Sequence, residues 1–406
     1  MKNLVMAAAK GYGRHDLEPF IVSFKKNISN ADLVLFVDDI SEFTLKYLND
    51  ENLTLVQIPN ELKDTLIVKA RWEMYKNFLD EHAEYENILV TDVRDVIFQD
   101  DLFSKYADYK NFLVYAVEAD LIKNDVNNQV WIKNFFGNEE LEKIKDNPIV
   151  CCGTAYGTRA EMETLLVKMI EHLKTGSAWG DEQAAMNYLI HNKLLPIENL
   201  IASDVQSGEI FTAGIVKDIK ISNDKILRGN GEVPAIVHQY NGHSELLALT
   251  DKIYRAGNFT PNENFKDAAS ILDQISCLVQ IQNFDSATKL FVQYILYKYY
   301  LIPYGNRILK LAQLILKKYT PNADILFLAV QKVLVAIFKI DLDNQQLNKV
   351  YDLLVESEKN SCAVYPEFKN FVKNVLVTFT DVFYKNNLPN LGLLCVKRLS
   401  EFEVTK

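Results

Sequence analysis

The chain lacks a cysteine framework. Its five cysteines form no CxxC pair, and their number is odd. Small secreted proteins that depend on disulfides show the opposite pattern, with paired cysteines at short spacings. We therefore expect reduced thiols in a cytoplasmic protein. The adjacent pair Cys151 and Cys152 is interpreted as the end of a buried strand rather than as a redox couple.

Long hydrophobic runs are also missing. The apolar start at residues 4–9 is too short for a signal peptide and runs directly into Lys10. The most apolar later stretch, 325–340, is interrupted by polar residues, whereas a membrane-spanning helix needs about 20 apolar residues. We expect no transmembrane segment and a cytoplasmic location, with peripheral attachment to the inner face of the membrane left open.

Nor does the chain have an excess of basic residues, since its formal net charge is −10. Nucleic-acid binding without sequence preference needs a basic surface, so we do not expect it. The glycine-rich loops of P-loop and dinucleotide-binding proteins are absent as well, which argues against ATP or NAD as a ligand. An anionic ligand can still bind where a metal ion or local arginines offset the charge.

What the chain does have is two successive patterns. At 406 residues it exceeds the usual size of one domain. Up to residue 245, short β-rich runs alternate with helical runs, which predicts an α/β domain with a mixed, mostly parallel sheet flanked by helices. The predicted strands are 3–8, 33–38, 53–58, 87–91, 112–118, 210–216 and 235–239, and the predicted helices are 18–26, 65–80, 159–174 and 182–191.

The second pattern begins near residue 262 and is wholly helical. Amphipathic segments follow one another with short gaps, which predicts antiparallel helical hairpins. The segments are 265–281, 285–299, 306–319, 323–340, 345–358, 366–384 and 391–402. The predicted organisation is therefore an α/β domain at 1–245, a linker at 246–261 and an all-α domain at 262–406.

The most distinctive motif is an acidic turn after a predicted strand. The apolar run 87–91 is followed by Asp92, Val93, Arg94 and Asp95, and then by a second apolar run. Ligands of α/β folds bind beyond the carboxyl ends of the strands. Two carboxylates at that place repel each other unless a cation lies between them, and oxygen ligands suit Mg²⁺ or Mn²⁺. The alternative is a solvated turn in which Arg94 pairs with one aspartate.

This turn resembles the DxD-type motif of nucleotide-sugar glycosyltransferases with the GT-A fold, of a bacterial-like kind. The usual motif separates its aspartates by one residue, whereas Asp92 and Asp95 are separated by two. Further segments occur in the order of that family: MAAAKGY (6–12), KARWEMY (69–75), CGTAYG (152–157), GDEQAAMN (180–187) and VHQY (237–240). The resemblance covers about residues 1–245, and the helical part has no counterpart in it.

The resemblance implies a set of site residues. The metal, Mn²⁺ or Mg²⁺, would be bound by Asp95 and His238, and the catalytic carboxylates would be Asp181 and Glu182, with Asp181 preferred. The nucleotide sugar would contact Ala8, Lys10, Tyr12, Arg71, Asp92 and Arg94, and the acceptor side would include Gly153, Thr154 and Trp179.

Each of these positions also has a purely structural interpretation. A histidine after a strand is commonly a hydrogen-bonded structural residue, and acidic residues that open a helix commonly cap it. Arg71 could form a surface salt bridge, and Tyr12 could fill the edge of the sheet. His243 is the alternative to His238 as a metal ligand.

The implied function is transfer of a sugar from a nucleoside diphosphate sugar, with a UDP-sugar favoured, to a hydroxyl of a glycan or lipid-linked glycan. The role would be in synthesis of a surface polysaccharide or similar glycan. The helical domain could bind a protein partner or form a dimer. Two alternatives are a sugar-nucleotide pyrophosphorylase and a non-catalytic helical-repeat adaptor with a degenerate α/β domain.

Overall fold

In the computed structural model, the described residues are 2–174, 178–255, 261, 264–265, 267–291, 311, 314–315, 376–377, 380, 384 and 389–404. The chain divides into two compact units. The first consists of Met1–Ile40 and Lys46–Arg255, and the second of Ser41–Leu45 and Ala256–Lys406.

The first unit is built on a seven-stranded sheet with the order β3-β2-β1-β4-β7-β6-β8. Strand β7 is antiparallel to both of its neighbours, and the other pairs are parallel. The predicted mixed, mostly parallel sheet is therefore confirmed. The strands are β1 (Lys2–Lys10), β2 (Ala31–Asp38), β3 (Thr54–Gln57), β4 (Tyr85–Thr91), β6 (Phe112–Leu121), β7 (Pro148–Thr158) and β8 (Asn199–Ser203).

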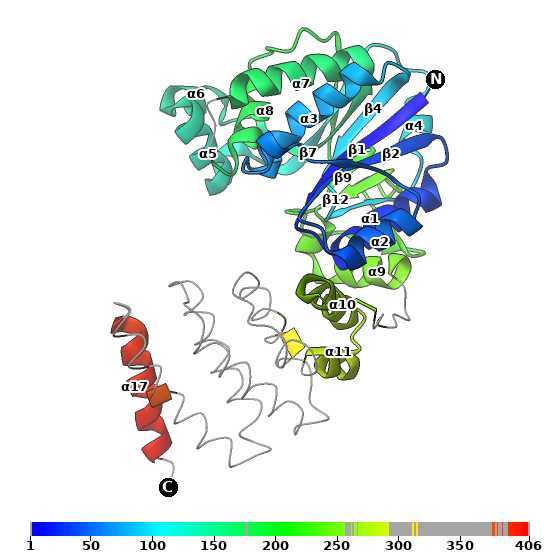
Figure 1. The fold of residues 1–406 in the computed structure, drawn as a ribbon. Coiled ribbons are helices and arrows are strands. Elements are labelled where there is room, and N and C mark those ends of the chain that lie inside the picture. Colours follow the sequence, from blue (N-terminus) through cyan, green and yellow to red (C-terminus); the bar gives the residue numbers. More distant parts are fainter. Residues whose placement is uncertain are drawn as a thin grey trace. The chain divides into compact units, whose positions relative to one another are not determined.

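Helices cover both faces of this sheet (Figure 1). In β1, Leu4 and Met6 pack into a core with α3, α7 and α8, whereas Val5 and Ala7 pack into a second core with α1 and α2. Successive side chains of a strand point to opposite faces, so burial on both faces requires a nearly continuous apolar sequence. The helices of the unit are α1 (Arg14–Asn27), the part of α2 (Glu42–Asp50) from residue 46 onward, α3 (Ile67–Glu81), α4 (Leu102–Lys105), α5 (Val126–Phe136), α6 (Asn138–Ile144), α7 (Arg159–Leu173), α8 (Asp181–His191) and α9 (Ser244–Tyr254), with one-turn helices η1 (Asn60–Leu62), η2 (Ile122–Asn124) and η3 (Tyr240–Gly242).

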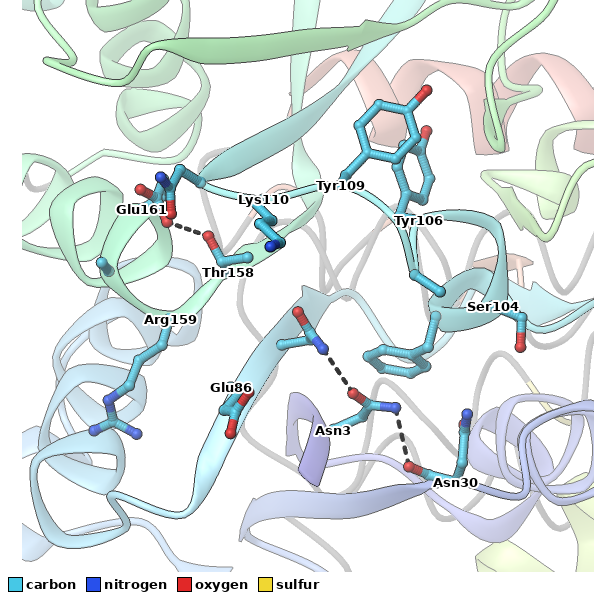
Figure 2. A pocket seen from close by; sticks show the side chains of 15 residues that line it. Asn3, Asn30, Glu86, Ser104, Tyr106, Tyr109, Lys110, Thr158, Arg159 and Glu161 are labelled. Atoms are coloured by element: carbon cyan, nitrogen blue, oxygen red, sulfur yellow. Dashed lines mark hydrogen bonds between the residues drawn. The ribbon is translucent and has the colours of Figure 1, made fainter. Parts of the chain in front are cut away.

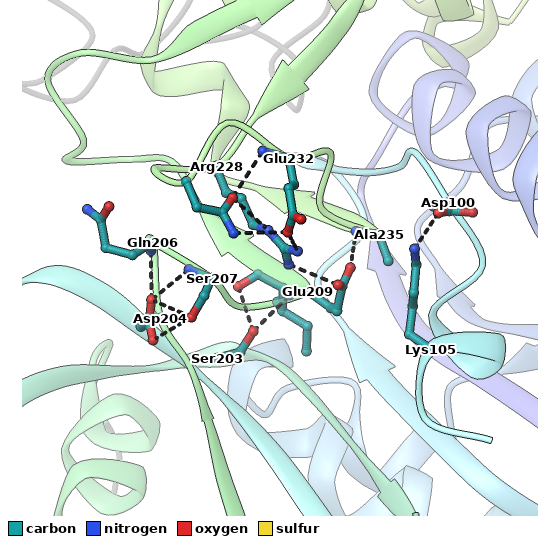
Figure 3. A network of polar contacts seen from close by, with 12 residues as sticks. Asp100, Lys105, Ser203, Asp204, Gln206, Ser207, Glu209, Arg228, Glu232 and Ala235 are labelled. Carbon is teal, nitrogen blue, oxygen red and sulfur yellow. Dashed lines mark hydrogen bonds and ion pairs between the residues drawn. The ribbon is translucent and has the colours of Figure 1, made fainter. Parts of the chain in front are cut away.

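A small second sheet brings the end of the α/β sequence back to the acidic turn. Its order is β5-β12-β9, with β5 (Val96–Phe98), β12 (Ile236–His238) and β9 (Ile210–Thr212). Beside it lies a hairpin of β10 (Lys220–Ser222) and β11 (Lys225–Leu227). Figure 3 shows the ion pairs that hold the chain after this hairpin: Arg228 is buried and pairs with Glu209 at 2.9 Å and with Glu232.

The predicted linker at 246–261 begins inside α9. Leu246 and Tyr254 of this helix are buried in a core with Val237 and Tyr240, so its packing belongs to the first unit. The adjacent Cys151 and Cys152 lie within β7 rather than at the end of a strand. The domain boundaries themselves stay a prediction.

In the second unit the described helices are α10 (Ala268–Gln280), α11 (Phe284–Leu290) and α17 (Pro389–Val404). They fall within or beside the segments predicted at 265–281, 285–299 and 391–402. The helices predicted at 306–319, 323–340, 345–358 and 366–384 lie almost wholly outside the described residues. Of the helices described, none is long and apolar enough to cross a membrane.

Candidate functional site

The acidic turn and the last strand of the α/β unit meet at the carboxyl end of β4. Asp92 follows β4 directly, and Asp95 precedes β5. Strand β12 pairs antiparallel with β5 and places His238 opposite Val96, one residue from Asp95. One ligand atom from each of Asp92, Asp95 and His238 lies within 4.8 Å of the others. We call these three residues the acidic-histidine cluster.

His238 presents one ring nitrogen to both carboxylates. Its Nε2 lies 3.3 Å from Asp92 Oδ2 and 3.7 Å from Asp95 Oδ1, and this buried atom has no hydrogen-bond partner among the described residues. The other nitrogen, Nδ1, lies 3.6 Å from Cys151 Sγ. In the metal-free protein, burial lowers the pKa of His238, but Cys151, Asp92 and Asp95 outweigh it and hold that pKa well above its usual range. A bound cation would replace the Nε2 proton, and the Nε2 lone pair would then face the cation, as in a metal-binding imidazole. Two carboxylates and one imidazole fit a divalent cation such as Mn²⁺.

Only glycine fits at position 153, because the side chains of His238 and Asp92 lie too close to its Cα to leave room for a Cβ atom. A Cβ atom there would lie 2.3 Å from His238 Cε1 and 2.6 Å from Asp92 Oδ2. The Gly153 carbonyl also accepts a hydrogen bond from the Asp92 amide at 2.7 Å. At this position strand β7 therefore contributes only backbone atoms to the cluster, while its Cys151 thiol contacts the other nitrogen of His238.

Arg71 connects the cluster to helix α8. Its guanidinium is buried and forms ion pairs with Asp92 and, at 2.9 Å, with Glu182. It also donates to the Cys152 carbonyl at 3.3 Å, while Trp72 Nε1 donates to Glu182 at 3.0 Å. The alternative of a surface salt bridge for Arg71 is thus wrong, because the arginine lies between two carboxylates inside the unit.

Burial and neighbouring charges shift the three carboxyl groups differently. For Asp92, burial favours the neutral form, but Arg71 and then His238 outweigh it and hold the pKa well below its usual range. Burial raises the pKa of Asp95 and the charge of Asp92 adds to this effect, while His238 and Arg94 oppose it without reversing it. Burial also raises the pKa of Glu182 to about 7, although Arg71 opposes the shift. A cation bound to the cluster would offset the repulsion between the two aspartates.

One cavity lies beside the cluster toward β1 and α3. Its volume is about 190 Å³. It is lined by residues predicted to contact a nucleotide sugar, namely Ala8, Tyr12, Arg71, Asp92 and Arg94. The Arg94 guanidinium lies 5.9 Å from the centre of the Tyr12 ring. Lys10, which is predicted to join them, is engaged elsewhere, with Asp38 at 3.6 Å and with the Lys63 carbonyl.

A second cavity, of about 310 Å³, lies on the other side of the cluster toward α5 and α8. Both cavities are lined by Asp92, Asp95, Trp179 and Glu182, so the cluster lies where they meet. Gly153 also lines the second cavity. We call the first the α3-side cavity and the second the α5-side cavity.

Three of the predicted site residues line neither cavity: Lys10, Asp181 and Thr154. Asp181, preferred as the catalytic carboxylate, accepts a hydrogen bond from the Ala178 amide at 2.8 Å and so fixes the turn before α8. Thr154 is buried and lies 3.2 Å from Thr91, hydroxyl to hydroxyl, within the sheet. His243, the alternative metal ligand, bonds to the Ala213 carbonyl at 2.8 Å.

Gln183 is a lining residue that the sequence did not single out. Its amide oxygen accepts from the Cys152 amide at 3.3 Å, and its Nε2 donates to Glu118 and Asn128, each at 3.2 Å. The available signal was its place in the first turn of the predicted helix, beside Glu182. Glu118 and Asn128 had no sequence signal, because β6 and α5 bring them to the site from distant parts of the chain.

A larger cavity, of about 530 Å³, lies at the opposite end of the central strands, where β1 and β4 begin (Figure 2). It is bordered by Asn3 and Asn87 at the beginnings of β1 and β4 and by Thr158 at the end of β7. Asn87 donates to Asn3 at 3.0 Å, and Asn3 donates to the Asn30 carbonyl at 3.1 Å. Its residues form no group like the acidic-histidine cluster among the described part of the chain. We therefore place the candidate functional site at the α3-side and α5-side cavities rather than here.

Comparisons with known proteins give only distant similarities. No family model matches the chain, and no curated protein matches it. The solved structure of the galactosyltransferase LgtC with donor and acceptor sugar analogues is 14% identical, over 65% of this chain and 98% of that one, with a TM-score of 0.39. The glycosyltransferase GlyE of Streptococcus pneumoniae is 15% identical, over 59% of this chain and 54% of that one, with a TM-score of 0.35.

Glucosyl-3-phosphoglycerate synthase from Mycobacterium tuberculosis, solved with Mn²⁺, UDP and glucosyl-3-phosphoglycerate, is 13% identical, over 51% of this chain and 70% of that one, with a TM-score of 0.34. Values this low assign the chain to no family. The functional interpretation therefore rests on the chain's own residues.

Proposed function

We propose that the chain is a metal-dependent glycosyltransferase that moves a sugar from a nucleoside diphosphate sugar, with a UDP-sugar favoured, to a hydroxyl of a glycan. The observation that carries the proposal is the acidic-histidine cluster at the junction of two cavities. Group transfer needs such an arrangement, because donor and acceptor must meet at one charged centre. A divalent cation there would neutralise the charge that develops on the leaving diphosphate.

The chain's own residues divide the remaining work between the cavities. In the α3-side cavity, Tyr12 offers a ring face to a base, while Arg94 and the cation offset phosphate charge. Arg71 is already paired with Asp92 and Glu182, so its role is to hold these two carboxylates in place. Glu182 and Gln183, rather than Asp181, are the α8 side chains positioned to contact the transferred sugar.

Both alternatives predict features that the site does not favour. A pyrophosphorylase would need a glycine-rich, basic loop directly after β1, whereas only Lys10 and Arg14 flank glycines there, and Lys10 is paired with Asp38 and with a backbone carbonyl. A degenerate, non-catalytic domain would have no reason to bring two carboxylates and a buried histidine nitrogen together where two cavities meet. An acceptor-binding or partner-binding role for the helical unit remains part of the proposal.

A panel of nucleotide sugars tests this function. Ligands that bind only the native state raise the melting temperature by mass action. We expect a rise with at least one UDP-sugar in the presence of Mn²⁺ and a much smaller rise with EDTA. Equal stabilisation with and without the metal, or none by any nucleotide sugar, would contradict the proposal.

A further inference from the structure

The α5-side cavity has a one-sided charge balance. Five carboxylate residues line it, and no lysine or arginine of the described residues does: the carboxylates are Asp92, Asp95, Glu118, Asp125 and Glu182. By sequence, residues 175–177, next to Trp179, carry no charge either. The α3-side cavity differs, because Arg71 and Arg94 line it. Arginine could thus neutralise an anion on the α3 side, whereas on the α5 side positive charge would come only from the cluster, through His238 and a bound cation.

The hydrogen-bonding groups of the α5-side cavity are mainly acceptors. Gln183 gives its amide hydrogens to Glu118 and Asn128, and Asn128 gives one of its own to Asp125 at 2.9 Å. These amide donors are used on one oxygen of each carboxylate, Glu118 Oε1 and Asp125 Oδ1, so the second oxygen of each, Glu118 Oε2 and Asp125 Oδ2, can accept from a ligand. A ligand that fits must therefore bring hydrogen-bond donors.

Two tryptophans complete the cavity. The Trp179 side chain is 64% exposed at the rim, and Trp131 packs so closely on Gly180 that a Cβ there would lie 2.3 Å from the indole. Flat apolar faces beside carboxylate acceptors suit a molecule with an apolar face and a polar edge. A sugar ring has both features, because its C–H face is apolar and its hydroxyls donate hydrogen bonds.

We propose that the α5-side cavity selects a neutral or amino sugar as the acceptor and excludes acceptors that carry a carboxylate or phosphate. This inference rests on the proposed function. A cation bound to the cluster would offset Asp92 and Asp95, and Arg71 pairs with Glu182, whereas Glu118 and Asp125 have no lysine or arginine partner among the described residues that line the cavity. An acidic acceptor would be repelled there and would lack a donor for its charged group. A hydroxyl or an ammonium group can donate to either carboxylate.

The test compares three probes that differ in one group: methyl glucoside, the corresponding 2-amino glycoside and methyl glucuronide. Transfer is measured at about physiological ionic strength with Mn²⁺ and the nucleotide sugar found in the panel above. We expect kcat/KM for the glucuronide to be at least about tenfold below that of the better uncharged or amino probe, since like charges at close range cost more than about 1.4 kcal/mol.

The selectivity ratio is kcat/KM for the better uncharged or amino probe divided by kcat/KM for the glucuronide. The double variant Glu118→Gln, Asp125→Asn should lower this ratio at least about threefold, because the amides keep the shape of the side chains and remove both charges. Asp120→Asn is the matched control. It removes one charge from the same end of β6 outside the cavity, and it should leave the ratio unchanged. A wild-type enzyme that uses the glucuronide as well as the glucoside overturns the inference, as does a ratio that the double variant leaves intact.

A binding arm separates this inference from the proposed function. The three probes are titrated by ligand-observed NMR onto full-length protein with diamagnetic Mg²⁺ and no nucleotide. Preference for the uncharged and amino probes supports the charge selection even if no nucleotide sugar binds, in which case only the transferase proposal fails. Preference for the glucuronide contradicts the inference whatever the nucleotide result.

Discussion

At the scale of residues, the site depends on a few atoms whose distances leave little freedom. Arg71 lies between Asp92 and Glu182, and Gly153 leaves no room for a side chain beside His238. The sequence identified these positions through an acidic turn, an arginine on a helix and a late histidine. It could not predict that Asp181 turns back to the Ala178 amide while Glu182 reaches the cavity. That choice depends on the geometry of the helix start.

Asp92 and Asp95 should respond differently to loss of charge in the metal-free protein. Asp92→Asn removes a carboxylate partner of buried Arg71, and we expect the free energy of unfolding to fall by about 2 kcal/mol. Asp95→Asn removes a carboxylate that burial and Asp92 both disfavour, so stability should stay equal or rise slightly. Urea denaturation in the presence of EDTA measures the free energy of unfolding of both variants. Equal losses of stability would show that the ion pair with Asp92 is not needed to stabilise buried Arg71.

Glu182 should give the metal-free protein a measurable dependence of stability on pH. Its folded-state pKa is raised by burial to about 7, so the proton that it retains stabilises the fold fully below its usual pKa near 4.5, and this stabilisation is lost as the pH rises through 7. Between about pH 5 and pH 8, wild type should lose up to about 3 kcal/mol relative to Glu182→Gln. Parallel pH profiles for the two proteins would contradict this assignment.

At the scale of elements, the sequence predicted the strands and helices that have a clear period. Apolar runs of β1, β2 and β4 and the helices α1, α3, α7 and α8 lie close to their predicted positions. Strands of three residues, such as β5, and the pairing of β5 with β12 have no such signal, because they depend on contacts between distant segments. The linker prediction likewise missed α9, whose apolar face is buried by tertiary packing.

The start of α8 offers a test at this scale. Gly180 has a φ of +93° and packs against Trp131, whereas Gly137 has the same φ and a Cβ there would meet no atom of the described residues within 4 Å. Alanine at Gly180, with ψ −11°, would bear the strain of the left-handed helical region, about 1 kcal/mol, whereas alanine at Gly137, with ψ 170°, would bear about 1–3 kcal/mol because that region is nearly restricted to glycine. Gly180→Ala adds a clash with the indole, so it alone should shift Glu182 and weaken nucleotide-sugar binding. Thermal unfolding and ligand titration compare the pair, and equal effects would argue against the contact.

At the scale of the whole molecule, the sequence predicted an α/β part followed by a helical part, and the proposed chemistry lies wholly in the first unit. Residues 41–45 group with the second unit, although they lie early in the chain, and no local pattern could have indicated that. The described residues of the helical unit contribute nothing to the acidic-histidine cluster. Its proposed role is therefore in binding an acceptor or a partner.

Truncation after about residue 260 tests this division. The shortened chain loses the unit with which residues 41–45 group, so we expect a lower melting temperature than for the full chain. Donor binding that depends on Mn²⁺ should persist with little change in Kd, because both cavities are formed by residues of the first unit. Loss of donor binding by a truncated protein whose circular dichroism shows a folded state would assign the helical unit to the donor site.

The most direct test of the central claim is calorimetric titration of Mn²⁺ into the full chain, with and without UDP, for wild type and for Asp95→Asn. The account predicts that wild type binds one Mn²⁺ and that UDP tightens this binding. It also predicts that Asp95→Asn, although folded, weakens it by at least about a hundredfold, because a charged ligand to the metal is lost. Unchanged Mn²⁺ affinity in Asp95→Asn, or no Mn²⁺ binding by wild type, would show that the acidic-histidine cluster is not the metal site.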